Sequence, residues 1–293
     1  MKMDNSENPK VCVVMPVYNG AKTIELALKS LFYQSYSNWN CVIVNDGSTD
    51  GTKQILDKID DIRFKIIHLD RNRGRGYARQ VCLENASGDF LTYLDADDFY
   101  HPEKIRNQVC VFENNINVHL VACGQGSFDN KFNIKSIRGV RNFGFHNFRN
   151  GDKINFVPVT SMIKLERALK TSYNSKLNAS EDVDYFSDYL LDNDYFISNE
   201  VHYYYYEFES ISYFKIIEYS FNSLKRLFFS RAKIGQRDFI KKSLIVSSKL
   251  IFYTLFYFVL GKNYFINKRG VKPTEHQVVE FINSLNVLNN SGL

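Results

Sequence analysis

The first half of the chain alternates short apolar runs with segments of helical spacing, and this alternation restricts the fold more than any other feature. The runs are rich in Val, Ile, Phe and Tyr and lie at residues 11–18, 41–46, 64–69, 90–95 and 118–123. Such runs, bounded by polar turns, are typical of strands buried on both faces. Between them, apolar residues recur at helical spacing, as at Ile24, Leu28 and Leu31. Strand–helix–strand alternation predicts right-handed crossovers and a mostly parallel sheet of the α/β class.

After residue 123 the pattern loosens. Residues 124–157 are rich in Gly, Asn, Phe and Arg without clear periodicity, which favours loops or a small mixed-sheet insertion. Helices are predicted at about 162–170 and 181–193, and the aromatic runs at 195–198 and 201–208 indicate late strands. No internal repeat or low-complexity tract interrupts this order.

Charge divides the chain into two parts. The net charge is +5, yet residues 213–272 carry thirteen Lys and Arg against two Asp and Glu, so the remaining residues sum to −6. A slightly acidic body followed by a basic, aromatic, helical segment suggests two roles. We therefore predict an α/β catalytic domain over residues 1–212 and a helical basic region over 213–293 that faces a membrane or a partner.

The apolar run Leu244–Leu260 is 17 residues long and is interrupted by Ser247, Ser248 and Lys249. A membrane-spanning helix needs about 20 apolar residues, so basic amphipathic helices lying on an anionic leaflet fit better than a spanning helix. A helical subdomain packed on the body or on a second protomer is the remaining alternative. Nucleic-acid binding is disfavoured, because nothing else in the chain resembles a reader module.

Cysteine and histidine usage excludes several classes of protein. The five cysteines are scattered and form no CxxC pair, which predicts buried free thiols in a reducing cytoplasm. The first ten residues lack the apolar segment of a signal peptide. The six histidines form no HExxH spacing, so a histidine-based zinc enzyme is disfavoured.

The predicted strand at 90–95 ends in the sequence LDADD, which places Asp95, Asp97 and Asp98 at its tip. Ligands of open α/β sheets bind at the carboxyl ends of strands. Carboxylates there either cap the next helix or hold a cation, and three acids in four residues exceed the need of a cap. Their mutual repulsion favours a positive ion among them. Oxygen-only ligands select Mg²⁺ or Mn²⁺.

A further acid, Asp46, ends the second predicted strand in the sequence VNDGSTDGT. A carboxylate there can accept hydrogen bonds from a ribose or a base, although an Asp-Gly turn is the common alternative. In the sequence NRGRGYARQ, Gly74 and Gly76 permit close approach of a ligand to the backbone, and Arg79 can neutralise phosphate. Neither GxGxxG nor a P-loop occurs, so dinucleotide and P-loop sites are not indicated.

Together, PVYNG, VNDGSTDGT, NRGRGYARQ, LDADD and SEDVDY resemble the family 2 glycosyltransferases of the GT-A fold, in order and spacing over about residues 10–212. The resemblance implies transfer of a sugar from a nucleotide-diphosphate donor with inversion at the anomeric carbon. It also implies the residues that bind the donor, namely Pro16, Tyr18, Asn19, Asp46, Gly76, Arg79 and Asp95.

Within this set the resemblance implies separate roles. Asp46 matches the acid that binds the base, and Arg79 would face the donor. Asp95 and Asp97 match the DxD pair, with Asp97 as the direct ligand of Mn²⁺ or Mg²⁺ and Asp95 nearer the ribose or sugar. Asp98 is the following acid of the motif.

The same resemblance makes Asp182 the general base, with Glu181 as the rival. Both carboxylates lie at a predicted helix start, where the dipole keeps a carboxylate ionised, although acids also favour such positions for stability alone. One departure concerns the metal. Relatives often carry a His after the strand that follows the base, whereas this chain has Glu207, which could be a third ligand or part of an exposed turn.

Members of this family often extend lipid-linked oligosaccharides during assembly of surface polysaccharide, O-antigen or capsule. The resemblance alone favours a UDP-sugar as the donor. The resemblance and the basic segment together predict a saccharide acceptor that is lipid-linked and a cytoplasmic enzyme at the inner face of the membrane. A nucleotide-sugar or lipid-binding module without turnover is the alternative. A sugar-nucleotidyltransferase is disfavoured, because PVYNGAKTIE lacks the glycine-rich basic segment that such an enzyme needs after its first strand.

Overall fold

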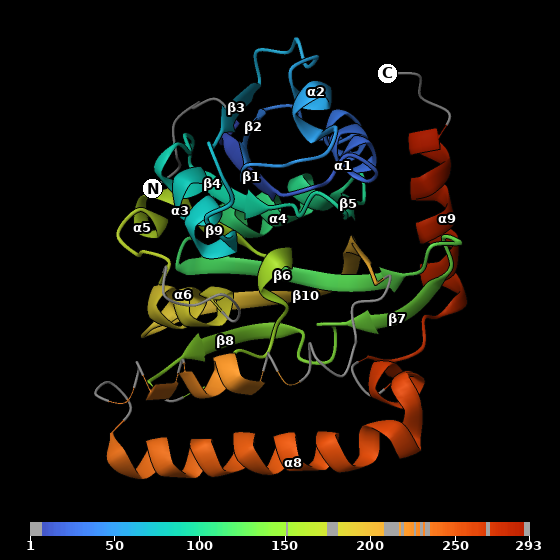
Figure 1. Ribbon diagram of the computed structural model, residues 1–293. Helices are drawn as coiled ribbons and strands as arrows, with labels where there is room; N and C mark the ends of the chain where they lie inside the picture. Colours follow the sequence, from blue (N-terminus) through green and yellow to red (C-terminus); the bar gives the residue numbers. More distant parts are fainter. Residues whose placement is uncertain are drawn as a thin grey trace.

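The computed structural model describes residues 8–150, 152–174, 181–207, 235–267 and 270–289, with short pieces at 217, 220–225, 227–228 and 231. Within these residues a ten-stranded sheet forms the centre of the molecule (Figure 1). Its strands are β1 (Val11–Val17), β2 (Trp39–Asn45), β3 (Phe64–His68), β4 (Phe90–Tyr93), β5 (Phe99–Tyr100), β6 (Val118–Phe128), β7 (Ile134–Arg138), β8 (Gly144–Phe148), β9 (Met162–Lys164) and β10 (Asn193–Tyr206).

The strand order is β3-β2-β1-β4-β9-β6-β10-β5, with β7 added to β6 and β8 added to β10. The first four strands are parallel to one another, as the alternating pattern predicted. The predicted fifth strand is β6, which is parallel to β10. Antiparallel β9 lies between β4 and β6. The mostly parallel α/β prediction is therefore confirmed.

Helices cover both faces of this sheet. The described helices are α1 (Ile24–Phe32), α2 (Thr52–Leu56), α3 (Arg75–Glu84), α4 (Lys104–Asn114), α5 (Leu165–Ala168), α6 (Glu181–Leu190), α8 (Gln236–Asn267) and α9 (Glu275–Asn289), with a 3₁₀ turn at Pro158–Thr160. The first six of them cover the two faces. One apolar core joins the sheet to α1, α2 and α4, and a second joins its other face to α3, α5 and α6. Alternate residues of β1 serve the two cores, since Val13 belongs to the first and Val14 to the second.

The predicted helix at 162–170 is wrong in its first part. Met162–Lys164 form strand β9, and only Leu165–Ala168 are helical. Met162 and Ile163 are fully buried between β4 and β6. Pairing with two neighbouring strands outweighs the local helical spacing, because it buries both side chains and completes the sheet. The region 124–157 does hold sheet structure, in the end of β6 and in β7 and β8.

The cysteines are free, and Cys12, Cys41, Cys82 and Cys123 are buried. Burial raises the pKa of the Cys12 thiol to about 11, which keeps this group protonated and unreactive. Cys110 is exposed on α4, so the prediction of buried thiols does not hold there.

Helix α9 packs against the edge of the sheet beside β5 (Figure 1). Its buried Phe281 contacts Phe99 and Phe128, with ring centroids 5.9 and 5.6 Å apart. Nearby, His101 Nε2 lies 3.0 Å from Glu280 Oε2. The residues between β4 and β5, which include Asp95, Asp97 and Asp98, are called the aspartate loop below. Since Phe99 directly follows Asp98, α9 supports the strand after this loop. A domain boundary at residue 212 stays a prediction.

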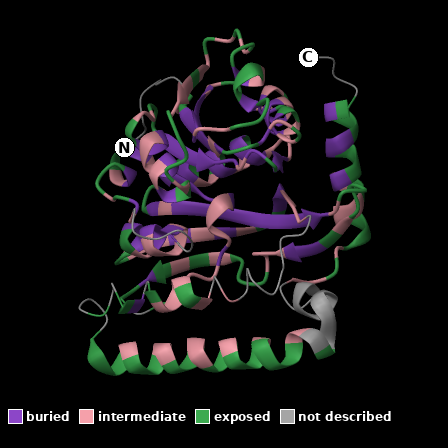
Figure 2. Ribbon diagram, in the orientation of Figure 1, coloured by how far each residue is buried: buried purple, intermediate pink, exposed green. Residues whose placement is uncertain are grey.

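Helix α8 is half exposed or fully exposed along the part whose side chains are described, in contrast to the buried sheet (Figure 2). Within the described residues, no helix combines the length and the apolar character that crossing a membrane requires.

The buried His202 of β10 predicts a pH-dependent stability. Burial lowers the pKa of His202 to about 3, and His101 and Lys104 add to this effect. Below about pH 6.5 the His202 imidazole is protonated in the unfolded state but stays neutral in the folded state. The free energy of unfolding therefore falls as pH drops from 6.5 toward 3. Lowering the pH from 7.5 to 5 should reduce the free energy of unfolding by about 2 kcal/mol through His202. Urea unfolding of His202→Phe should show a flatter pH profile than the wild type, whereas exposed His276→Phe should not. A profile unchanged by His202→Phe would contradict the assignment.

Candidate active site

The loops after β1 and β2 are joined at the carboxyl ends of these neighbouring strands. Asn19, with φ 54°, donates its backbone N–H to Ser48 Oγ at 2.9 Å. Its side-chain oxygen accepts the Thr49 N–H at 2.9 Å. Asn19 therefore fixes the VNDGST turn. Pro16 lies in β1 opposite Val44, and Tyr18 presents a ring that is half exposed at the same edge.

Asp46 holds the loop that precedes α3. Its two carboxylate oxygens accept the N–H groups of Arg73 at 2.8 Å and Gly74 at 2.9 Å. Burial raises the pKa of Asp46, and these two hydrogen bonds oppose that shift. Gly47, at φ 65°, leaves no space for a Cβ, which would lie 2.3 Å from the carbonyl carbon of Arg71. This structural role of Asp46 was missed by the sequence reasoning, and its contact with a nucleotide base stays a prediction.

Gly74 precedes α3 at φ 92°, a left-handed conformation that favours glycine. Gly76 is buried in the first turn of α3. The loop and helix thus take the form predicted for the NRGRGYARQ sequence, with backbone groups close to the strand ends. Their contact with a donor stays a prediction.

Arg79 joins three parts of the site. Its guanidinium lies 3.3 Å from Asp95 Oδ1 and 2.8 Å from Glu181 Oε1, and its side chain is only 6% exposed. Burial alone would lower the pKa of Arg79, but Asp95 and Glu181 raise it well above its ordinary value. The pairing of Arg79 with a residue 102 positions away was not foreseen from the sequence.

Replacing Arg79 by Ala should therefore destabilise the fold strongly. The change leaves Glu181 as a buried carboxylate without its cation, and breaking a buried pair costs about 3–5 kcal/mol. The measurement is urea unfolding at pH 7.5. Arg73→Ala is the matched control, because Arg73 is more exposed and pairs with Asp70 at the surface, where such pairs contribute only about 0–1 kcal/mol. Equal stability losses in the two variants would contradict the structure.

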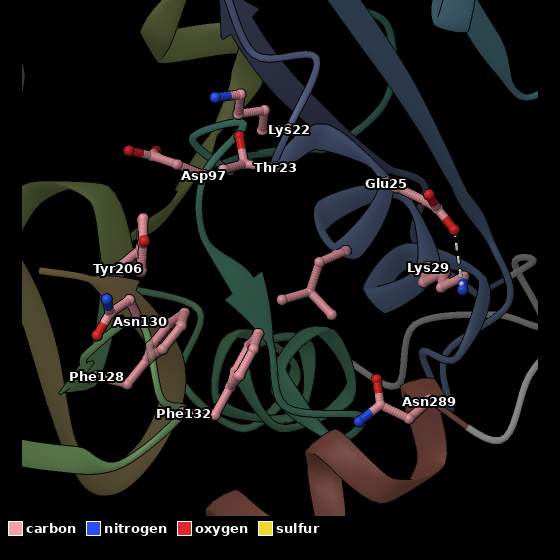
Figure 3. A pocket seen from close by; sticks show the side chains of 11 residues that line it. Lys22, Thr23, Glu25, Lys29, Asp97, Phe128, Asn130, Phe132, Tyr206 and Asn289 are labelled. Carbon is pink, nitrogen blue, oxygen red and sulfur yellow. Dashed lines mark ion pairs between the residues drawn. The ribbon is translucent and has the colours of Figure 1, made fainter. Parts of the chain in front are cut away.

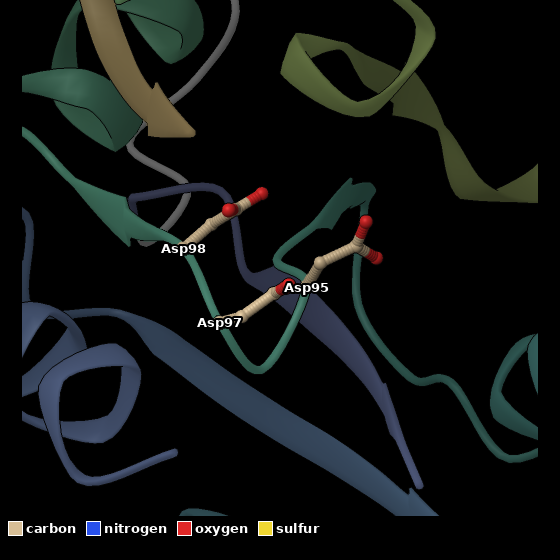
Figure 4. Close-up of side chains that lie close together, drawn as sticks. All are labelled: Asp95, Asp97 and Asp98. Carbon is tan, nitrogen blue, oxygen red and sulfur yellow. The ribbon is translucent and has the colours of Figure 1, made fainter. Parts of the chain in front are cut away.

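The three aspartates of the LDADD sequence converge, with one carboxylate oxygen of each within 4.8 Å of the others (Figure 4). Asp98 is fully buried and is fixed to β10. One oxygen accepts the Tyr203 O–H at 2.6 Å and the other accepts the Tyr206 N–H at 2.9 Å. Burial raises the pKa of Asp98, and Asp97 and Asp95 raise it further. Asp98 is therefore a structural acid.

The remaining two aspartates fit a divalent cation. Asp97 is exposed, Asp95 is half buried, and the Tyr203 hydroxyl accepts the Asp95 N–H at 3.1 Å. Two oxygen ligands on a fixed loop, open to solvent on one side, match the incomplete protein shell with which Mg²⁺ and Mn²⁺ are commonly held beside a phosphate.

Glu207 contacts other residues than the three aspartates. It forms an ion pair with Arg138 of β7, and its side chain is 5% exposed. Among the described residues, the group of acids that converges is Asp95, Asp97 and Asp98. Glu207 thus has a cationic partner that the sequence did not indicate, and its role as a third metal ligand stays a prediction.

The two candidate bases differ in environment. Glu181 is 2% exposed at the start of α6 and is held by Arg79. Burial raises the pKa of Glu181, while Arg79 opposes the shift. Asp182 is half buried, and its Oδ1 accepts the Val183 N–H at 2.7 Å. Residues 178–180 of the NASEDVDY sequence lie outside the described residues.

Comparison with known structures establishes the fold class. S. aureus TarS 1-349 superposes with a TM-score of 0.59 at 18% identity, over 95% of this chain and 80% of that chain. The mannosyltransferase PcManGT from Pyrobaculum calidifontis, in complex with GDP-Man and Mn²⁺, gives 0.59 at 16% identity, over 98% and 77%. At these identities the likeness shows the fold alone, which is GT-A.

The family follows from sequence. A family model described as glycosyl transferase family 2 matches residues 12–170, and the chain belongs to this family. EpsE of Bacillus subtilis (strain 168), named as a candidate glycosyltransferase, is 33% identical over 137 residues, or 45% of this chain and 49% of EpsE. The Escherichia coli UDP-Glc:alpha-D-GlcNAc-diphosphoundecaprenol beta-1,3-glucosyltransferase WfgD is 34% identical over 107 residues, or 36% and 42%. The matches thus span about half or less of these relatives.

Proposed function

We propose that the protein is an inverting glycosyltransferase that moves a sugar from a UDP-sugar to a saccharide acceptor in surface-polysaccharide biosynthesis. The observation that carries this proposal is the linked site, in which Arg79 contacts Asp95 of the aspartate loop and Glu181 beside the candidate base. Family membership and the donor named for WfgD support it.

Donor binding would use the strand ends. Tyr18 offers an exposed ring face to a base, and Asp46 and Asn19 hold the two loops between which the nucleoside would lie. Asp97 and Asp95 would hold Mn²⁺ or Mg²⁺ on the diphosphate. When bound, the cation supplies positive charge that stabilises the departing nucleoside diphosphate.

The acceptor hydroxyl attacks the anomeric carbon on the face opposite the diphosphate, so a new C–O bond forms as the sugar–phosphate bond breaks. The hydroxyl proton passes to a carboxylate. Asp182 suits this role better than Glu181, because Glu181 is buried against Arg79 whereas Asp182 is accessible at the start of α6. Arg79, held by Asp95 and Glu181, keeps its charge beside the donor.

Thermal shift with UDP and with GDP, each with Mn²⁺ and with EDTA, tests the donor. A matched nucleotide stabilises the fold by mass action, and we expect the largest shift with UDP and Mn²⁺. Equal shifts with both nucleotides, or a shift that EDTA leaves unchanged, would count against the proposal.

Release of UDP from UDP-glucose and UDP-GlcNAc distinguishes an enzyme from a binding module. A transferase should hydrolyse its donor slowly in the absence of acceptor, with Mn²⁺ and not with EDTA. A nucleotide-sugar or lipid-binding module would bind without turnover in either condition, and that result would favour this alternative.

We also propose that the acceptor is lipid-linked and that the protein lies peripherally on the cytoplasmic face of the membrane. WfgD is named for a diphosphoundecaprenol acceptor, which supports the first part. The second rests on α8. Its exposed apolar residues lie along one broad face at helical spacing. They are Ile240, Leu244, Ile245, Ile251, Phe252, Leu255, Phe256 and Val259. Lys241 and Lys249 of the same helix are also exposed and would attract an anionic leaflet.

Sedimentation with vesicles tests the membrane proposal. We expect binding to phosphatidylglycerol vesicles but not to phosphatidylcholine vesicles, and loss of that binding in the double variant Leu244→Gln, Leu255→Gln. Val279→Gln on α9, also exposed, is the control. Equal binding of both vesicle types would contradict the membrane proposal. A dimer that the double variant dissociates would show instead that this face of α8 binds a second copy of the chain.

A further inference from the structure

A cavity of about 320 Å³ opens beside Asp97 (Figure 3). Its volume lies at the lower end of the ~300–1,000 Å³ typical of small-molecule sites. The wall is built by the first part of α1, the β6–β7 hairpin, the end of β10 and the end of α9. The lining includes Lys22 and Thr23 from the loop after β1, but neither Tyr18, Asn19 nor Asp46 is among the lining residues. The cavity therefore borders the aspartate loop and the loop after β1, next to the residues assigned to the nucleoside.

Aromatic rings form one side of the cavity. Phe128 and Phe132 stack with centroids 5.7 Å apart and planes 13° apart, and Tyr206 lies 5.4 Å from Phe128. Phe128 is buried, but Phe132 is half exposed at the hairpin tip. A half-exposed ring on a cavity wall offers a flat apolar face to a ligand.

The backbone that carries this ring is strained. Phe132 has φ 54°, which is unfavourable for a bulky residue. Its N–H bonds to the Asp129 carbonyl at 2.9 Å, and Asp129 Oδ1 accepts the N–H groups of Lys131 and Asn133 at 2.9 Å. Such strain is destabilising and is found mainly at functional sites. The hairpin thus holds Phe132 in place at a cost to stability.

Apart from Leu26, the rest of the lining is polar. Lys22 and Lys29 balance Glu25 and Asp97, and Lys29 lies 3.1 Å from Glu25. Thr23, Asn130 and Asn289 add a hydroxyl and two amides (Figure 3). Amides and hydroxyls pair with the hydroxyls of a ligand.

We propose that this cavity is a saccharide subsite, in which Phe132 stacks on the apolar face of one sugar unit of the acceptor and Asn130 and Asn289 bond its hydroxyls. The identification of the saccharide as acceptor rests on the proposed function, because the donor diphosphate would occupy the other side of Asp97. The saccharide chemistry itself rests on the cavity alone.

Saturation-transfer NMR with glucose, galactose and N-acetylglucosamine as free sugars tests the subsite. The wild type should transfer saturation to the ring protons of at least one of them. Phe132→Gly removes the ring and suits the positive φ, so the hairpin keeps its form. It should weaken the binding ~3- to 10-fold, as expected for the loss of one ring contact. Phe143→Ala, exposed outside the cavity, should leave it unchanged.

Absence of transfer to all three sugars in the wild type, or binding unchanged by Phe132→Gly, would overturn the proposal. The thermal shift with UDP and Mn²⁺ separates the two proposals. If sugar binding depends on Phe132 but no nucleotide shifts the melting temperature, the proposed transferase function is contradicted and the saccharide subsite is supported. If a nucleotide shifts the melting temperature but no sugar binds, the subsite is contradicted and the transferase function is supported.

Discussion

Replacement of Asp97 by Ala is expected to lower Mn²⁺-dependent transfer by ~10²–10³-fold, the range seen when one preorganised electrostatic group is lost. Asp97 is exposed and projects from the fixed aspartate loop, whereas buried Asp98 holds the loop to β10. The loss should therefore fall on turnover and on the Mn²⁺ concentration needed for half-maximal rate. The measurement is UDP release as a function of Mn²⁺ concentration.

The unfolding free energy of this variant should change by no more than about 0.5 kcal/mol, as for most surface substitutions. Asp60→Ala, an exposed acid between α2 and β3, is the matched control and should leave both turnover and metal dependence intact. Wild-type transfer by Asp97→Ala, or transfer by the wild type in EDTA, would remove the metal from the mechanism.

Replacement of Asp182 by Asn should lower transfer to the acceptor by ~10²–10⁴-fold, the usual contribution of general base catalysis. The amide keeps the shape of the side chain and can still accept the Val183 N–H. Because Asp182 acts on the acceptor hydroxyl, the thermal shift with UDP and Mn²⁺ should persist. The measurement combines this shift with initial rates of transfer.

Asp188→Asn, on the exposed side of the same helix, is the control and should transfer at the wild-type rate. Glu181→Gln separates the rival base. It should reduce the unfolding free energy through loss of the charged contact with Arg79. If its pH–rate profile keeps the acidic limb, in which the rate rises as the base loses its proton, Asp182 remains the base. If Asp182→Asn transfers sugar at the wild-type rate, Asp182 is not the general base.

The parallel half of the fold could be predicted from the sequence, because strands buried on both faces have continuous apolar runs and the crossover helices have their own spacing. Strand β9 could not, since Met162–Lys164 is too short to show a period and is strand only through its two neighbours. The late strands were predicted as two pieces, yet β10 is one strand with register shifts between Ile197 and Val201.

The candidate site shows the same limit. The positions of the acids at strand ends follow from local pattern, as with Asp95 and Asp97. The partners that set their roles do not. Tyr203 bonds Asp98 across 105 positions and Arg79 bonds Glu181 across 102. Such long-range polar contacts depend on the tertiary arrangement, so the sequence could name the charged groups but not divide them into structural and reactive ones.

The packing of α9 has a consequence for biosynthesis. His101, three residues after Asp98, contacts Glu280 across 179 positions. During translation the aspartate loop leaves the ribosome long before the helix that supports its strand. Phe99 therefore lacks its packing partner Phe281 until α9 has been made, so the strand after Asp98 is completed only late in synthesis.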